Sequence, residues 1–171
     1  CCANQARQER RETAEASEDN WRGEQISGPD VWRLSHVVIG AAREDGRSRL
    51  YVSGFRELWE YSWEEGKFKG EPLAAPRTDP RIVGNPAGLF IASLREDGKE
   101  RLYLANGSKI LEFSFTGGRW TSEVISPGVG ELARATVGSV SGLREPRIFL
   151  AGEIEGLYSL HWPTKKKMIV V

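Results

Sequence analysis

Two segments of the chain carry the same charged and aromatic residues at the same spacing. Each has an arginine, a glutamate 11 residues later, and aromatic residues 14 and 19 residues after the arginine. The two sets are Arg49, Glu60, Trp63 and Phe68, and Arg101, Glu112, Phe115 and Trp120. A guanidinium group beside a carboxylate can donate hydrogen bonds to vicinal hydroxyls and accept them in return. Because aromatic rings add an apolar face that suits the C–H side of a sugar ring, the pattern indicates two candidate monosaccharide sites.

A third segment keeps only part of this pattern. Arg147 is followed at the same intervals by Tyr158, His161 and Lys166. The carboxylate and the two aromatic residues are therefore missing at the corresponding intervals. We expect no third sugar site.

The same residues also have a purely structural interpretation. An arginine opposite a glutamate on adjacent strands is often a cross-strand pair that contributes about 0.2–1 kcal/mol. Aromatic residues that recur at one position of a repeat are often packing residues between neighbouring sheets. Both interpretations place Arg and Glu side by side on one hairpin.

The elements that position these residues form an internal repeat. The sequence Arg-Glu-Asp-Gly occurs at 43–46 and at 95–98, and Arg-Leu-Tyr occurs at 49–51 and at 101–103, an offset of 52 residues in both cases. The third copy retains Arg-Ile-Phe-Leu at 147–150 but lacks the Asp-Gly turn. Asp-Gly between apolar segments is a strong hairpin signal, so each copy predicts a series of short antiparallel strands.

The alternation of apolar segments and turn residues predicts four strands in each copy. The expected ranges are 37–42, 49–53, 58–63 and 67–73; 89–94, 101–105, 110–115 and 120–126; and 135–140, 147–151, 157–162 and 168–171. Four antiparallel strands in about 45–50 residues match one blade of a β-propeller. The expected fold class is therefore all-β, with four-stranded antiparallel blades.

The predicted domain organisation follows from these repeats. Residues 1–20 are charged and lack large apolar side chains, which predicts a flexible tether. Blades are expected at about 32–74, 82–126 and 132–171. The segment 21–27 resembles 120–126 and predicts an extra outer strand at the N-terminus. Three blades are too few to close a ring, so either a longer propeller or a second copy of the chain is expected to complete it.

The Arg-x-Tyr strand and the glutamate 11 residues after the arginine resemble the six-bladed fucose-binding propeller lectins of fungi and soil bacteria. The resemblance covers mainly residues 37–126. It implies that Arg49 with Glu60, and Arg101 with Glu112, bind sugar hydroxyls, with aromatic residues of the adjoining blade stacking on the ring. It also implies that a ring can be assembled from short chains. The Arg-Glu-Asp-Gly turn is not part of the lectin pattern.

The composition argues against three other classes of function: nucleic-acid binding, metal binding and catalysis. The chain has 24 Lys and Arg residues against 24 Asp and Glu residues, so it has no net field to attract nucleic acid. Two adjacent cysteines and two histidines do not provide a Cys/His metal cluster, and we expect no cofactor or metal. No nucleophile elbow is present, so we expect no catalytic residues.

The cysteine at position 1 suggests a location. Mature bacterial lipoproteins begin at a lipid-bearing cysteine, so Cys1 followed by a charged tether predicts a lipid anchor in the bacterial envelope or at the cell exterior. An arbitrary boundary followed by a short charged helix is the alternative. Taken together, the expected function is a non-enzymatic, sugar-binding module of the envelope. The alternative function is an envelope-anchored scaffold subunit that binds a protein partner. A third and less favoured alternative is an enzyme whose catalytic residues are scattered around the mouth of the ring.

Overall fold

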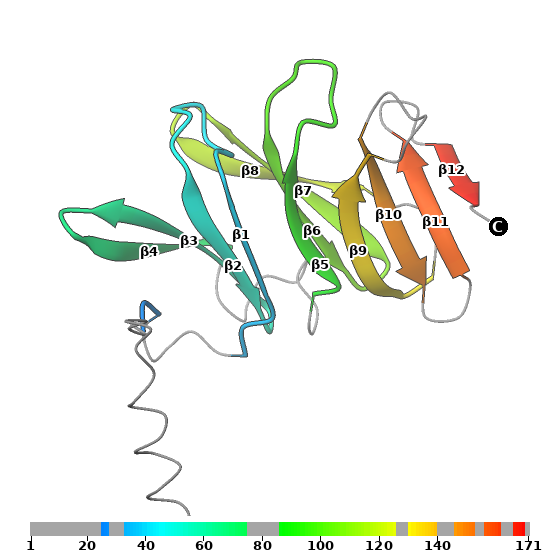
Figure 1. The fold of residues 1–171 in the computed structure, drawn as a ribbon, viewed down its shortest axis with the longest axis horizontal. Helices are drawn as coiled ribbons and strands as arrows, with labels where there is room; N and C mark the ends of the chain where they lie inside the picture. The colour runs from blue at the N-terminus through cyan, green and yellow to red at the C-terminus, as the bar shows by residue number, and fades with distance from the viewer. Residues whose placement is uncertain are drawn as a thin grey trace, which may run out of the picture.

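The computed structural model describes residues 25–27, 33–74, 86–125, 130–139, 146–152, 156–161 and 166–169. These residues form twelve β-strands and no helix, as Figure 1 shows. No helix able to cross a membrane is found among them. The predicted tether at 1–20 lies outside the described residues.

The strands are grouped into three four-stranded antiparallel sheets, each following the chain order. The first sheet contains β1 (His36–Gly40), β2 (Arg49–Gly54), β3 (Glu57–Glu64) and β4 (Lys67–Ala74). The second contains β5 (Gly88–Ala92), β6 (Arg101–Asn106), β7 (Lys109–Thr116) and β8 (Arg119–Ile125). The third contains β9 (Leu132–Gly138), β10 (Arg147–Gly152), β11 (Gly156–His161) and β12 (Lys166–Ile169). All twelve predicted strands are present, with ends that differ by a few residues.

The Asp-Gly turns form as the sequence predicts. Gly46 and Gly98 both have φ of 65°, a left-handed conformation that favours glycine. Their amides donate to the carbonyls of Arg43 and Arg95 at 3.3 and 3.1 Å, which closes the two turns in the same way. The identical geometry brings Arg43 and Arg95 to equivalent places beside their sheets.

Each sheet buries apolar residues against the next sheet along the chain. We call the face that contacts the following sheet the covering face, and the opposite face, which contacts the preceding sheet, the receiving face. The covering face of the first sheet packs on the receiving face of the second. The covering residues are Val38, Ala42, Tyr51, Leu58 and Leu73, and the receiving residues are Leu89, Ile91, Leu102, Leu104, Leu111 and Phe113.

The second and third sheets repeat this contact. The covering residues of the second sheet are Phe90, Ala92, Leu94, Tyr103, Ala105, Ile110 and Ile125. The receiving residues of the third are Ala135, Val137, Ile148, Leu150, Tyr158 and Leu160. Two successive interfaces of the same kind therefore make up the core. This arrangement is expected because one sheet cannot bury both of its faces alone.

The first strand of each sheet lies beside the first strand of the next. The Ala135 amide donates to the Ala87 carbonyl at 3.1 Å, which links the start of β5 directly to β9. A side chain at Gly88 would place its Cβ 2.3 Å from the Ala135 carbonyl oxygen, so only glycine permits this approach. The three described sheets lie in a row and do not close a ring (Figure 1).

Two sequence predictions differ from the structure. Of the predicted outer strand at 21–27, residues 25–27 are described and are not in a strand. The reason is local: the Gln25 side chain donates to the Ser27 carbonyl at 3.2 Å, and Ile26 lines a hollow beside Leu34 rather than a sheet edge.

The second difference concerns the third repeat. Ser159 pairs with Phe149 as Glu112 pairs with Tyr103, so Ser159, and not Tyr158, takes the glutamate position. The turn after β10 is one residue longer than its counterparts, which shifts the positions on β11 by one. Counted this way, Trp162 occupies the sequence position of Phe115, although Trp162 lies outside the described residues. The carboxylate is still missing, but an aromatic residue is retained.

Candidate functional site

Arg49 lies at the start of β2 and its guanidinium is held by groups of its own sheet. Its Nη1 and Nη2 donate to the two carboxylate oxygens of Asp45 at 2.8 and 2.5 Å. Its Nε donates to Ser62 Oγ at 3.2 Å and lies 3.4 Å from Glu60 Oε1. Asp45 therefore fixes the turn to the strand through a bidentate pair.

Glu60 lies on β3 between two arginines. The pairing of Tyr51 with Glu60 places this carboxylate next to Arg49 on the covering face. Arg43, from the turn, donates through Nε to Glu60 Oε2 at 3.0 Å and forms an ion pair through Nη2 with Glu60 Oε1. Glu60 is only 1% exposed, so both of its oxygens are used inside the protein.

The second sheet repeats this network. Arg95 donates through Nε to both oxygens of Glu112, at 2.9 and 3.1 Å. Arg101 donates through Nε to Ser114 Oγ at 3.1 Å and through Nη1 to Asp97 at 2.8 Å. Glu112 is 3% exposed. The two networks are thus built from the Arg-Glu-Asp-Gly turn and the following hairpin together.

These contacts show where the two arginine–glutamate pairs that were predicted to bind sugar lie in the structure. Arg49 with Glu60, and Arg101 with Glu112, are brought together as the 11-residue spacing predicts. Each pair, however, is joined by a second arginine and by an aspartate of the turn. The carboxylates therefore bind protein groups, and the network acts as a brace within each sheet.

Phe115 and Trp120 pack between the first and second sheets. Their ring centroids are 5.3 Å apart in an edge-to-face arrangement. The Arg43 guanidinium carbon lies 4.4 Å from the Phe115 centroid, and Tyr51 meets Trp120 edge to face at 6.0 Å. Arg43 therefore takes the place between Glu60 and Phe115 that a sugar would take under the lectin resemblance.

Trp63 and Phe68 are the equivalent aromatic pair of the first sheet. Their centroids are 4.9 Å apart, and Trp63 is 61% exposed. No described sheet precedes the first sheet, and within the described part of the chain no arginine stacks on this pair. The two aromatic pairs thus have the same internal geometry and different surroundings.

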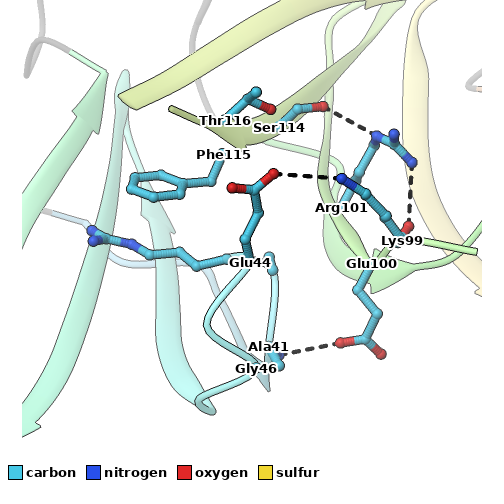
Figure 2. Close-up of a pocket in the computed structure, with 11 residues that line it drawn as sticks. Ala41, Glu44, Gly46, Lys99, Glu100, Arg101, Ser114, Phe115 and Thr116 are labelled. Atoms are coloured by element: carbon cyan, nitrogen blue, oxygen red, sulfur yellow. Dashed lines mark hydrogen bonds and ion pairs between the residues drawn. The ribbon is translucent and has the colours of Figure 1, made fainter. Parts of the chain in front are cut away.

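A cleft of about 340 Å³ opens between the turns of the first and second sheets (Figure 2). Its lining residues are Ala41, Ala42, Arg43, Glu44, Gly46, Lys99, Glu100, Arg101, Ser114, Phe115 and Thr116. Figure 2 shows Glu44 and Lys99 pointing toward one another from opposite turns, with Nζ 3.4 Å from the carboxylate. The Ala41 amide donates to Glu100 at 3.2 Å. The cleft therefore offers charged donors and acceptors around one aromatic ring.

Of the eight predicted site residues, Arg101 and Phe115 line this cleft. Sequence reasoning missed Glu44, Lys99 and Glu100, which come from the turns. A signal for the turns was present, because Arg-Glu-Asp-Gly recurs at the same offset as the arginine pattern. The repeat predicts a turn, and the charged side chains of that turn also build the cleft.

The charges of the network shift the ionisation of its members. The hydrogen bonds of Arg49 and Arg101 hold the pKa values of Asp45 and Asp97 well below the usual range for aspartate. Burial, with the nearby carboxylates of Glu60 and Glu112 adding to it, raises the pKa values of Tyr51 and Tyr103. At neutral pH the two aspartates are therefore charged and the two tyrosines neutral.

The lowered pKa values predict an acid-sensitive fold. A carboxylate with a depressed folded-state pKa adds stability above its unfolded pKa of about 3.9, and this contribution is lost as the pH falls below that value. We expect the free energy of unfolding to fall with acidification, and to fall less steeply in the double variant Asp45→Asn with Asp97→Asn. Urea unfolding at a series of pH values measures the slope. The exposed neighbour Glu96→Gln serves as control, and equal slopes in all three proteins would contradict the prediction.

Comparisons with known proteins do not extend these observations. No family model, curated protein or solved structure matches the chain. Among the residues that the structure describes, no group of three His, Cys, Asp or Glu side chains could hold a metal ion.

Proposed function

We propose that this chain is a non-enzymatic binding module whose three sheets are consecutive blades of a β-propeller. Its ligand is a monosaccharide-sized polyhydroxyl group, fucose or a related sugar, held in the cleft between the first and second sheets. The observation that carries the proposal is the convergence on Phe115 of charged side chains from two successive turns. The site lies beside the residues that the lectin resemblance selects but draws on different side chains.

The chemistry of the cleft suits hydroxyl groups. Lys99 supplies an ammonium donor, and the carboxylates of Glu44 and Glu100 supply acceptors. Ser114 and Thr116 add hydroxyls that can donate or accept. Phe115 contributes apolar surface to the cleft beside the stacked Arg43 guanidinium, and this surface suits the C–H groups of a sugar. The volume of about 340 Å³ lies within the range of small-molecule sites, about 300–1,000 Å³.

The described titratable residues that line this cleft are Arg, Glu and Lys, which can bind a hydroxyl-rich ligand without a reaction. The proposed location is the bacterial envelope or the cell exterior, with Cys1 as lipid attachment point. Cys1 lies outside the described residues, so mass spectrometry of the native protein is the direct test of a lipid.

Titration with free monosaccharides tests the ligand proposal. NMR or calorimetric titration with a panel that includes L-fucose is expected to show saturable binding. Lys99→Ala is expected to weaken binding about tenfold, because one charge-assisted hydrogen bond contributes about 1.5 kcal/mol or more. Both Lys99 and Glu44 are exposed, so substitutions there are expected to leave the fold intact.

Arg47→Ala provides the matched control for this experiment. Arg47 lies in the same turn as Glu44 and is exposed, but it does not line the cleft. Its replacement is expected to leave sugar affinity unchanged. A folded native protein that binds no sugar of the panel, nor any glycan of an array, would overturn the carbohydrate proposal.

A second candidate function is a scaffold subunit that binds a protein partner. The observation that favours it is the apolar receiving face of the first sheet, where Val37, Ile39 and Trp63 are strongly exposed. Apolar patches of this kind on a folded chain commonly mark interaction surfaces. This role does not depend on sugar binding, and both can belong to one module.

A further inference from the structure

The first and second sheets present equivalent residues on equivalent faces. An offset of 52 residues relates the receiving face of the first sheet to that of the second, strand by strand. The first sheet presents Val37, Ile39, Leu50, Val52, Trp59, Tyr61, Trp63 and Phe68. The second presents Leu89, Ile91, Leu102, Leu104, Leu111, Phe113, Phe115 and Trp120. Every position of both sets is apolar or aromatic.

The two faces differ in what covers them. In the second sheet, Leu102, Leu104 and Leu111 are fully buried beneath the first sheet. In the first sheet, Ile39 remains 70% exposed, and Val37 and Trp63 are exposed as well. Val52 and Tyr61 of the same face are buried, and Ile26 and Ser27 lie against it. The surface that is core in the second sheet is therefore partly open in the first.

A hollow of about 340 Å³ lies in the open face. Its walls include Val37, Leu50, Val52 and Tyr61, the counterparts of residues that the first sheet covers in the second. Tyr61 is 3% exposed, and its hydroxyl has no hydrogen-bond partner within the described part of the chain. An occupant of the hollow would supply apolar side chains and an acceptor or donor for this hydroxyl.

The covered interface shows which chemistry fits the face. Tyr51 and Leu58 of the first sheet fill the centre of the contact with the second. Arg43 crosses from its turn to stack on Phe115 at 4.4 Å, while its Nη2 pairs with Glu60. A guanidinium stacked on an aromatic ring is attracted by the ring quadrupole, and the attraction is stronger when the pair is partly desolvated. Trp63 and Phe68 form the same kind of aromatic pair, and no arginine of the described residues stacks on them.

We propose that the receiving face of the first sheet binds a further four-stranded sheet of this repeat type, with an arginine at the position of Arg43 and Arg95. That sheet places an apolar covering face centred on a tyrosine over Val37, Ile39 and the hollow. Its arginine stacks on Trp63 and Phe68. The inference gives the partner-binding role a surface and a partner of defined chemistry, and it is independent of sugar binding.

The third sheet of a second copy does not meet this description. Its covering face carries Thr136, Phe149 and Ser159 where the second sheet has Phe90, Tyr103 and Glu112. In the sequence, the third residue after Gly138 is Ser141, whereas the third residues after Gly40 and Ala92 are arginines. A second copy therefore has no arginine at the position of Arg43 and Arg95 in its third repeat.

An internal duplication supplies a probe of known chemistry. The chain is extended so that residues 1–85 are followed by residues 34–171, which places an additional Arg43-bearing sheet before the original first sheet. Ile39→Cys is introduced only in the original copy, with Cys1 and Cys2 replaced by serine, and the rate of thiol labelling is measured. We expect labelling about tenfold slower, or more, than in the unduplicated chain with the same substitution, because the site must open before it reacts.

Matched variants identify the contact. Ile39→Cys placed in the added copy is expected to label at the fast rate of the unduplicated chain, since both have the same residues before that sheet. Arg43→Ala in the added copy is expected to restore part of the labelling rate in the original copy. Unchanged labelling in the duplicated chain would overturn the inference.

Sedimentation of the unduplicated chain tests the remaining alternative, in which a second copy of the chain covers the face. A monomer whose labelling rate does not depend on protein concentration agrees with the inference. A dimer that protects the Ile39→Cys thiol would overturn it in favour of a second copy as occupant. Sugar titration of the same proteins reports on the cleft alone, so failure of either proposal is visible independently.

Discussion

Replacing Glu112 with alanine is expected to lower the free energy of unfolding by about 3 kcal/mol, because removing one partner of a buried ion pair leaves the other charge uncompensated. Glu112 is 3% exposed. Its Oε1 accepts a hydrogen bond from Arg95 Nε at 2.9 Å and lies 3.5 Å from Arg101 Nε. Its loss leaves two guanidinium groups on a face packed against the third sheet. Arg95 keeps Glu123 and Arg101 keeps Asp97, so the effect falls at the low end of the range for buried pairs.

Glu123→Ala is the matched control for this prediction. Glu123 also pairs with Arg95, at 2.6 Å, but it is 49% exposed, so its removal is expected to cost less than about 1 kcal/mol. Glu112→Gln keeps the shape and one acceptor, and its cost is expected to lie between the two. Urea unfolding of all three variants measures the order. Equal costs for Glu112→Ala and Glu123→Ala would show that the network does not brace the sheet.

The strands and their pairing follow directly from the sequence. Asp97-Gly98 fixes a turn, and the apolar alternation on either side leaves one register that buries Leu102 and Leu104 on the same face. Arg101 and Glu112 lie on neighbouring strands of one hairpin, so local spacing alone was enough to bring them together. Local patterns therefore predicted the sheets and the arginine–glutamate pairs.

The identity of the remaining site residues depends on contacts between sheets, which the local spacing of residues does not predict. Arg43 reaches both Glu60 and Phe115, which belong to different sheets, and its path is set by the turn that Asp45 fixes to Arg49. Nothing in the spacing of Arg49 and Glu60 indicates that a third charged residue lies between the carboxylate and the ring. Burial of Glu60 likewise depends on the second sheet, which packs against it.

The third repeat shows that one extra turn residue makes fixed sequence intervals point to the wrong equivalent residue. The longer turn between β10 and β11 places Ser159, not Tyr158, opposite Phe149. Turn length is fixed by how Gly152 and Gly156 pair across the hairpin, and fixed intervals ignore it. Pairing in the sheet, rather than distance along the chain, is the correct guide to equivalent positions.

Gly88→Ala is expected to lower the free energy of unfolding by about 3 kcal/mol, the upper part of the usual range for overpacking. The new Cβ would lie 2.3 Å from the Ala135 carbonyl oxygen and 3.1 Å from its carbon. Both are backbone atoms of a neighbouring strand, so relief requires β5 and β9 to separate. Separation would also stretch the hydrogen bond from the Ala135 amide to the Ala87 carbonyl, now 3.1 Å.

Two other glycines, Gly40 and Gly138, serve as controls for this prediction. Gly40 is the counterpart of Ala92, and a Cβ there would lie 2.7 Å from Ile91 Cδ1, the end of a flexible side chain, so Gly40→Ala is expected to cost about 1 kcal/mol. Gly138 has nothing within 4 Å of its would-be Cβ, and Gly138→Ala is expected to be neutral or slightly stabilising. Thermal and urea unfolding give the order Gly88, Gly40, Gly138. A neutral Gly88→Ala would mean that β5 and β9 do not approach this closely, and the packing of the second sheet on the third, on which the repeated interface depends, would have to be revised.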